Sequence, residues 1–131
     1  MRAAFAVLHV SPRMARPLWF GHPWVRDEMV ARVDGAPAPG DVVRVVDEHG
    51  QTIDFALWSG QSRLRARTLG VGAEWPTAWP QPALPSAFWD ERVARARVLR
   101  AGLGLPSDDT DCYRLLNAEG DATPGVIVDV D

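Results

Sequence analysis

The chain has 131 residues, of which 47% are hydrophobic and 24% charged, and its formal net charge is −3 at pH 7. These values are ordinary for a soluble globular protein with one domain, or with one compact domain and an appendage. They exclude a membrane-spanning protein, because no apolar run approaches the roughly 20 residues that cross a bilayer. The single cysteine, Cys112, cannot form an internal disulfide and has no Cys or His neighbour at metal-ligand spacing.

The N-terminal apolar run AAFAVLHV is short, contains His9 and lacks a signal-peptide cleavage site, so we expect a cytoplasmic protein. Charge is divided unevenly along the chain. Residues 1–71 contain nine Arg and seven acidic residues, whereas residues 72–131 contain five Arg and ten acidic residues. The negative total argues against a general nucleic-acid binder, but the first half can still present a basic face.

Short apolar runs separated by turns fill residues 1–71. They recur at spacings of about ten residues, which favours a small barrel or sandwich over a parallel α/β sheet. Turns are predicted at residues 47–50 and 59–61. In the less regular stretch before them, Pro23 is predicted to open one short helix that runs through Val30.

Residues 72–87 contain four prolines and two tryptophans. Each proline removes a hydrogen-bond donor and favours extended backbone before it, so no regular structure is expected. Because Trp75 and Trp79 are large and aromatic, we expect a strap packed on a surface rather than a free linker.

A helix capped by Ser86 is predicted next, and the glycines and proline of residues 102–106 end it. Arg92 and Arg95 lie off its apolar stripe, where a solvated helix face is a simpler interpretation than an RNA contact. The stripe consists of Trp89, Val93, Ala96, Leu99 and Leu103.

The last predicted element is residues 113–131, YRLLNAEGDATPGVIVDVD. Two apolar runs flank a turn-rich centre, which predicts a β-hairpin whose second strand ends with the chain. We expect this hairpin either to fold back against the predicted helix or to pair with a second copy through its open edge.

The segment SRLRART places arginines at alternate positions of a predicted strand. Alternate side chains share one face and lie roughly 6.6 to 6.8 Å apart, close to the spacing of phosphates in an extended single strand. Arg63, Arg65 and Arg67 are therefore expected to form a row that binds a nucleic-acid backbone. The alternative is a polar outer face that is neutralised by carboxylates on neighbouring strands, namely Asp41, Asp47 or Asp54.

The segment FGHPWV is a second candidate contact. A helix that begins at Pro23 would place His22 and Trp24 beside its free N–H groups, where a base could stack on the indole and a phosphate could bind the amides. The alternative is that Trp24 plugs the barrel and His22 bonds to the backbone. Arg13 and Arg16 are further candidates in the same corner.

The chain resembles the N-terminal region of the large-subunit (23S) rRNA cytosine C5-methyltransferases in the order of five segments: FGHPWV, PGDVVRVVDEHG, SGQSRLRARTL, FWDERVARARVLR and residues 113–131. In that family the first zone is a PUA domain that recognises RNA, and the hairpin leads into a methyltransferase domain that uses S-adenosylmethionine. The chain departs from the family at Arg26, where an aromatic residue is usual, and at Ala122 and Thr123, where Gly-Leu is usual.

The resemblance implies a mainly β (α+β) fold with a PUA-like pseudo-barrel at residues 1–71, a strap and connecting helix at 72–106, and a hairpin at 107–131. It also implies that the chain stops before the catalytic domain. No Gly-rich loop, ribose-binding acid or attacking cysteine follows the hairpin, so no catalytic, cofactor or metal residue is assigned and the chain alone is not expected to methylate RNA.

We therefore expect an RNA-binding module of an rRNA methyltransferase-like protein, with ribosomal RNA as partner and no membrane contact. The alternative is a protein-interaction or dimerisation domain without RNA affinity, in which the hairpin mediates a homodimer. A hydrolase built on the acids of residues 108–111 is a poor third reading, because clustered acids without a histidine or metal pattern are usually a solvated loop. The candidate RNA-binding residues are Arg63, Arg65, Arg67, Arg13, Arg16, His22 and Trp24.

Overall fold

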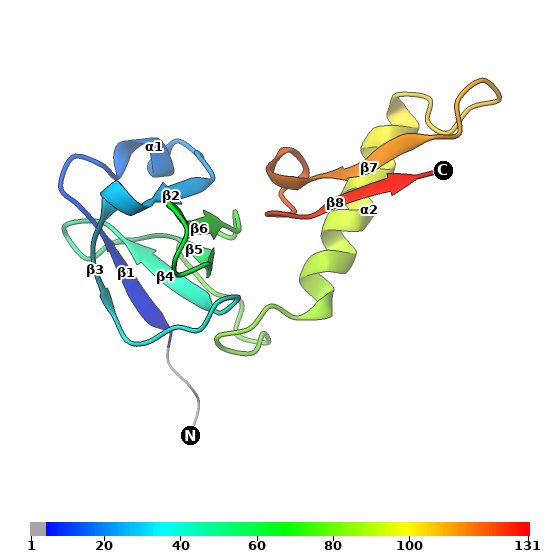
Figure 1. Cartoon of the computed structure of the whole chain (residues 1–131). Helices are drawn as coiled ribbons and strands as arrows, with labels where there is room; N and C mark the ends of the chain where they lie inside the picture. Colours follow the sequence, from blue (N-terminus) through cyan, green and yellow to red (C-terminus); the bar gives the residue numbers. More distant parts are fainter. Residues whose placement is uncertain (1–4) are drawn as a thin grey trace. The chain divides into compact units, whose positions relative to one another are not determined.

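The computed structural model describes residues 5–131, which form two compact units. The first unit runs to Leu84 and the second from Pro85 to Asp131. Figure 1 shows a curled β-sheet in the first unit, and one long helix with a β-hairpin in the second. The prediction of a mainly β fold with one principal helix is confirmed. Within residues 5–131, no helix has the length and apolar character needed to cross a bilayer.

The sheet of the first unit has the strand order β2-β6-β5-β4-β1-β3. Strands β1 and β4 pair in parallel, and the other neighbours are antiparallel. The sheet curls into a half-barrel (Figure 1). Its strands are β1 (Ala6–Val10), β2 (Trp24–Arg26), β3 (Val30–Asp34), β4 (Val42–Val46), β5 (Thr52–Trp58) and β6 (Leu64–Thr68).

The core of this unit is built from small and branched apolar residues of its strands. Leu8, Val25, Val43 and Ala66 are each fully buried in it. Burial of a Val or Leu side chain contributes about 1.5–3 kcal/mol, so the short strands are stabilised mainly by their shared core. The predicted turns at residues 47–50 and 59–61 are confirmed as the β4–β5 and β5–β6 connections.

The prediction of a helix from Pro23 to Val30 is wrong. Trp24–Arg26 is strand β2, and it is followed by a single 3-10 turn, η1 (Asp27–Met29), before β3. Val25 lies opposite Ala66 of β6 and is fully buried, so strand pairing and core packing override the helix-start signal of the proline. The helical turn of this region comes earlier, as α1 (Arg16–Trp19), which has Pro17 at its start.

The Pro-rich segment is a strap on the first unit, as predicted. The ring of Trp75 packs against Phe5 and Phe55, with centroid distances of 5.1 and 5.0 Å. Its indole N–H donates a hydrogen bond to the carbonyl oxygen of Pro80 at 3.1 Å. At the start of the strap, the carboxylate of Asp54 accepts hydrogen bonds from the backbone N–H groups of residues 70, 71 and 72.

The second unit contains the predicted helix, α2 (Ser86–Gly102), which ends in the Gly-rich stretch as expected. Ser86 is not its cap, because Pro85 occupies the N-cap position and no side chain bonds to the free N–H groups. The expected solvated position is confirmed for Arg95, whose side chain is 63% exposed. It is wrong for Arg92, whose side chain is 6% exposed and whose guanidinium lies 4.6 Å from the ring centre of Phe88.

The predicted hairpin consists of β7 (Tyr113–Asn117) and β8 (Ile127–Val130), joined through the 3-10 turn η2 (Ala118–Asp121). Leu115 and Leu116 pack with Ala96 of α2 in a second hydrophobic cluster. The expectation that the hairpin folds back on the helix is therefore confirmed. The helical stripe is only partly used, since Leu99 and Leu103 remain 54% and 68% exposed.

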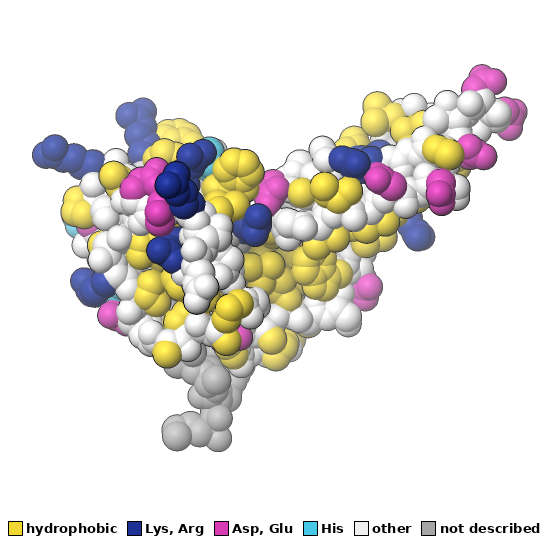
Figure 2. Space-filling view, viewed as in Figure 1, with side chains coloured by type: hydrophobic (Ala, Val, Ile, Leu, Met, Phe, Trp, Pro, Cys, Tyr) yellow, Lys and Arg dark blue, Asp and Glu magenta, His cyan; other side chains and the backbone are white. Residues whose placement is uncertain are grey.

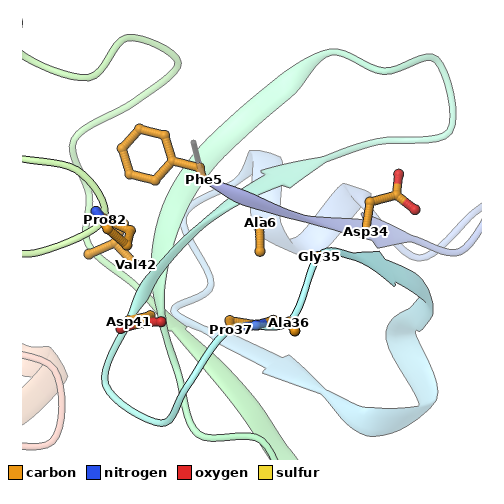
Figure 3. Close-up of a pocket in the computed structure, with 9 residues that line it drawn as sticks. All are labelled: Phe5, Ala6, Asp34, Gly35, Ala36, Pro37, Asp41, Val42 and Pro82. Carbon is orange, nitrogen blue, oxygen red and sulfur yellow. The ribbon is translucent and has the colours of Figure 1, made fainter. Parts of the chain in front are cut away.

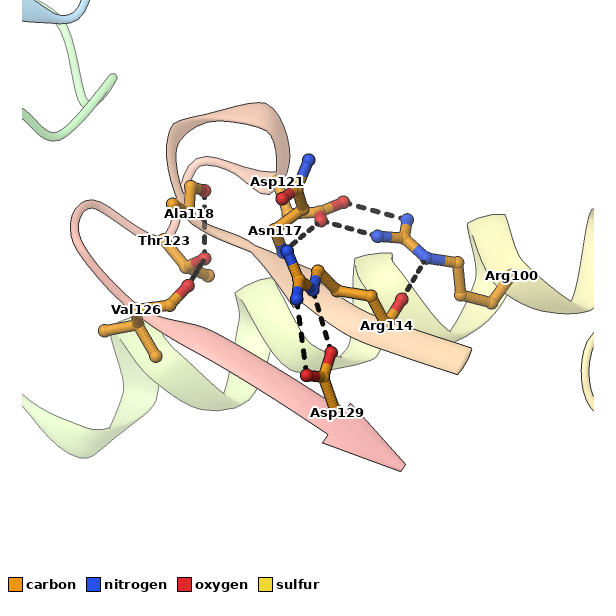
Figure 4. Close-up of polar contacts among 8 residues, drawn as sticks. All are labelled: Arg100, Arg114, Asn117, Ala118, Asp121, Thr123, Val126 and Asp129. Atoms are coloured by element: carbon orange, nitrogen blue, oxygen red, sulfur yellow. Dashed lines mark hydrogen bonds and ion pairs between the residues drawn. The ribbon is translucent and has the colours of Figure 1, made fainter. Parts of the chain in front are cut away.

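An ion pair and several hydrogen bonds join the helix to the hairpin (Figure 4). Nη1 and Nη2 of Arg100 donate hydrogen bonds to the two carboxylate oxygens of Asp121, at 3.0 and 2.6 Å. Nε of Arg100 donates to the backbone carbonyl of Arg114 at 2.9 Å, and the N–H of Asn117 donates to Asp121 at 2.7 Å. The hydrogen bond from Arg100 is the main cause that lowers the pKa of Asp121 from its ordinary value of 3.8.

Candidate nucleic-acid interface

The edge of the half-barrel formed by β2 and β6 positions the candidate arginines. β6 begins at Leu64, so Arg63 lies just before the strand, while Arg65 and Arg67 lie within it. The pairing with β2 passes from Val25–Ala66 to Arg26–Leu64, which leaves Arg65 as the extra residue of a β-bulge. The row is therefore less regular than the three alternate positions expected from the sequence.

The three arginines differ in their surroundings. Arg63 is exposed, whereas Arg65 and Arg67 are half-buried. Nη1 of Arg65 donates a hydrogen bond to the carbonyl oxygen of Gly60 in the preceding turn. Arg67 pairs directly opposite Trp24, and opposite residues of an antiparallel pair share one face of the sheet.

The carboxylates expected as alternative partners of these arginines are engaged locally. Asp41 accepts a hydrogen bond from the N–H of Ala38, and Asp47 accepts those of His49 and Gln51. Asp54 accepts four backbone N–H groups, three from the strap and one from its neighbour Phe55. These bonds orient the three aspartates toward their own turns and strand ends.

A nearer acid is Asp27, which follows β2. Its backbone N–H donates a hydrogen bond to the carbonyl oxygen of Arg63 at 2.7 Å. A hydrogen bond to the Glu28 side chain is the main cause that lowers the pKa of Asp27, and the positive charges of Arg65 and Arg63 lower it further. Two carboxylates thus lie in the same corner as the arginines and reduce, without cancelling, its positive charge.

Between β2, η1 and the start of β6 the surface forms a hollow of about 380 Å³, which we call the Trp24 hollow. The guanidinium carbon of Arg26 lies 6.0 Å from the ring centre of Trp24, so a cation and an aromatic face lie side by side. The hollow is lined by Trp24, Arg26, Glu28, Arg63 and Leu64.

The structure places the residues of the FGHPWV corner as follows. Nδ1 of His22 accepts the backbone N–H of Trp24 at 3.2 Å, which agrees with the alternative in which the histidine bonds to the backbone. Trp24 is half-buried and is not a member of the barrel core, and its buried Nε1 has no hydrogen-bond acceptor among the described residues. The helix N-terminus expected beside these rings is not formed, because residues 24–26 are strand β2.

Arg13 and Arg16 lie apart from the Trp24 hollow in the chain and line another hollow, beside α1 and the β4–β5 turn. Both are exposed. Figure 2 shows arginine, acidic and hydrophobic side chains close together on the first unit. Arg13 and Arg16 therefore line a different hollow from Trp24 and Arg63.

Another hollow of the first unit, of about 340 Å³, is lined by acidic rather than basic side chains (Figure 3). Phe5, Val42 and Pro82 lie on one side of it and Asp34 on the other. Its charged groups are the carboxylates of Asp34 and Asp41, which disfavour a polyanion. In the described part of the chain, no group of three His, Cys, Asp or Glu side chains could hold a metal ion.

Comparison with known proteins shows which proteins this chain is similar to. Residues 8–70 match the model of the PUA-like domain. Ribosomal RNA large subunit methyltransferase I of Erwinia tasmaniensis is 37% identical over 109 residues, which are 82% of this chain and 25% of that protein. Ribosomal RNA large subunit methyltransferase of Deinococcus radiodurans is 37% identical over 125 residues, which are 93% of this chain and 29% of that protein.

The chain is homologous to these ribosomal RNA large subunit methyltransferases. It spans about a quarter of the length of the curated relatives that it matches. Among solved structures, a proposed SAM-dependent methyltransferase from Streptococcus mutans shares the fold with a TM-score of 0.72 at 18% identity. The match covers 95% of this chain and 30% of that one, and a proposed methyltransferase in complex with SAH gives the same values.

All seven candidate residues lie inside the PUA-like domain, between residues 8 and 70. Sequence reasoning did not select Arg26 as a contact, although its place two residues after Trp24 puts both side chains on one face of β2. It also overlooked the adjacent aromatic residues Trp19 and Phe20, which the structure exposes. The signal for them was the pair of large rings directly before the helix-ending Gly21.

Proposed function

We propose that the PUA-like domain binds RNA and positions a methyltransferase on ribosomal RNA. In this proposal residues 1–71 contact the RNA, residues 72–106 connect, and residues 107–131 lead toward a methyltransferase domain of the kind the relatives are named for. The cofactor S-adenosylmethionine would belong to that domain, and no residue of this chain is assigned to it. A cytoplasmic location would accompany a ribosomal RNA partner.

The observation that carries the proposal is the Trp24 hollow. It joins the face of an aromatic ring to the guanidinium groups of Arg26 and Arg63, within a chain whose overall charge is negative. Guanidinium groups bind phosphates in a planar, bidentate way, and aromatic rings stack on unpaired bases. Arg65 and Arg67 would extend the basic edge along β6, and His22 would orient Trp24 through its hydrogen bond.

The test is a binding titration of fluorescein-labelled rRNA fragments at two salt concentrations. We expect the Arg63→Gln, Arg65→Gln, Arg67→Gln variant to bind more weakly and to lose about 0.7–0.9 units of salt slope for each phosphate contact removed. Arg63→Gln alone provides a variant that cannot perturb the fold, since the side chain is exposed. The matched control is Arg95→Gln, an exposed arginine of α2. If the triple variant and Arg63→Gln both kept the RNA affinity and the salt slope of the wild type, the assignment of these arginines to RNA binding would be refuted.

A second candidate function is association through the hairpin. Strand β8 pairs only with β7 in the described chain, and Ile127 and Val128 are 54% and 38% exposed. An open, apolar strand edge is a template for pairing with another chain. Light scattering after gel filtration tests this: a dimer that Ile127→Lys converts to a monomer, with no RNA binding by either form, would favour association over RNA binding.

A further inference from the structure

Two large aromatic side chains are exposed at the end of α1. Trp19 is 48% exposed and Phe20 is 79% exposed, and Met14, which precedes the helix α1, is 39% exposed. We call Trp19 and Phe20 the aromatic pair. Single exposed apolar residues are common, but two adjacent rings in a charged setting indicate a contact surface.

The backbone holds the aromatic pair in a fixed position. The N–H of His22 donates to the carbonyl oxygen of Pro17 at 2.9 Å, and the N–H of Gly21 donates to that of Leu18 at 3.0 Å. These two bonds form a Schellman motif, which requires the left-handed φ of +90° that Gly21 adopts. Phe20 is thus the last residue of a closed helix end, so its ring is presented without the entropic cost of ordering a loose loop.

The aromatic pair lines a hollow of about 520 Å³, within the range of small-ligand sites. On its near side the guanidinium carbon of Arg16 lies 5.6 Å from the ring centre of Phe20. Arg13 also lines the hollow, whereas the opposite wall is the β4–β5 turn with the carboxylates of Asp47 and Glu48. The Asp47 carboxylate is occupied by the backbone N–H groups of His49 and Gln51, and Glu48 is exposed. Positive charge and ring faces therefore lie together on one side, and the two carboxylates keep a phosphate to that side.

Arg13 occupies an unusual backbone position. The N–H of Met14 donates to the carbonyl oxygen of Ser11 at 3.1 Å, and Arg13 has a φ of +70°. With Pro12 before it, this is the pattern of a type II turn, whose third position favours glycine. An arginine there costs stability that a glycine would not.

We propose that the aromatic pair stacks an unpaired base of single-stranded RNA while Arg13 and Arg16 bind the neighbouring phosphates. This inference rests on the proposed RNA binding and adds a second site, distinct from the Trp24 hollow, that recognises unpaired rather than duplex RNA. Stacking on an aromatic side chain accepts any base, because every base has a π face. Guanidinium groups beside the rings make a nucleotide a better occupant than an apolar protein segment.

The experiment measures fluorescence anisotropy with two labelled RNAs of the same composition, one single-stranded and one a hairpin whose bases are all paired because a non-nucleotide linker closes the stem. We expect Phe20→Ala, alone and with Trp19→Ala, to weaken binding of the single strand by about 5- to 150-fold and binding of the hairpin by less than about 3-fold. Trp19→Phe and Phe20→Tyr should retain affinity because they keep a ring. Phe20 is largely exposed, so its replacement leaves the fold intact, and a thermal melt verifies this.

Arg13 offers a second, independent readout. Arg13→Gln and Arg13→Gly both remove the charge, so both should lower the salt slope equally, but only Arg13→Gly should raise the melting temperature. If the wild type binds neither RNA, the proposed function and this inference both fail. If the wild type binds RNA but the alanine variants bind the single strand equally well, this inference alone is overturned. It is also overturned if the alanine variants lose binding of the RNA hairpin as much as binding of the single strand, or if the aromatic pair is required for binding a protein partner and not for binding RNA.

Discussion

Replacement of Asp121 by Asn should destabilise the second unit selectively. Asp121 and Arg100 form a two-bond ion pair whose side chains are only 6% and 12% exposed, and the same carboxylate accepts the N–H of Asn117. Removal of one partner of a buried pair costs about 3–5 kcal/mol, and an exposed pair contributes about 0–1 kcal/mol. Since Asn retains one acceptor oxygen, we expect a loss of about 2–4 kcal/mol.

The chain contains its own control for this substitution. Arg114 and Asp129 form an ion pair of the same chemistry across the hairpin (Figure 4), but their side chains are 48% and 61% exposed. Asp129→Asn should therefore destabilise the hairpin far less than Asp121→Asn, because solvent screens an exposed pair. Because both variants replace Asp by Asn in an Arg–Asp pair, the difference between their effects on stability reports the contribution of burial.

Hydrogen exchange followed by mass spectrometry is the suitable assay, because it reports on each unit separately. For Asp121→Asn we expect exchange of amides in β7 and β8 to accelerate by about 25- to 700-fold, with no change in the sheet of the first unit. For Asp129→Asn the acceleration should stay below about 5-fold. Equal effects of the two variants, or no effect of Asp121→Asn, would refute the claim that burial makes the Arg100–Asp121 pair important.

The same pair predicts a pH dependence. The hydrogen bond from Arg100 lowers the pKa of Asp121 below the 3.8 of the unfolded chain. The folded state therefore binds fewer protons, so the stabilisation is complete well above pH 3.8 and is lost as the pH falls through the lower folded pKa. The difference between wild type and Asp121→Asn in hairpin exchange should accordingly narrow in acid, after correction for the intrinsic exchange rate.

Three further predictions concern the first unit. Trp75→Ala should lower the unfolding free energy by about 2–4 kcal/mol in a urea titration, because it removes the ring that packs on Phe5 and Phe55. Asp54→Ala should cost about 2–3 kcal/mol and increase proteolysis within residues 70–84, since the N–H groups at the start of the strap lose their acceptor. Gly21→Ala should cost about 1 kcal/mol in the same titration through its φ of +90°, and an unchanged midpoint would contradict the helix-end geometry.

Local signals in the sequence were sufficient for most elements of the fold. The alternation and turns of residues 40–69 predicted β4, β5 and β6, because turn residues and β-branched side chains act over a few positions. The strap was also predictable, since proline excludes regular structure and tryptophan requires a packing surface. The helix from Pro23 was wrong because its local start signal was outweighed by burial of Val25, which depends on a partner strand about 40 residues later.

The candidate site was less predictable than the fold. Alternation placed Arg65 and Arg67 in one strand, but the bulge at Arg65 and the start of β6 after Arg63 depend on pairing with β2. The adjacent rings of Trp19 and Phe20 were visible in the sequence, but their exposure depends on tertiary packing, because large aromatic residues are buried more often than not and α1 is only four residues long. The burial of Arg92 likewise depends on tertiary packing, since its position in the helix alone indicated solvent.

Strand β1 precedes the other strands of its sheet in the chain, yet lies between β3 and β4 in the finished sheet. These two neighbours begin 24 and 36 residues after β1 begins, so neither can dock until the chain has grown well past it. The half-barrel consequently cannot close from its N-terminal end during synthesis. We expect the side chains of Leu8 and Val10 to remain incompletely buried in the nascent chain until residues 42–46 have emerged. The nascent chain should bind chaperones and misassociate most readily before that point in synthesis.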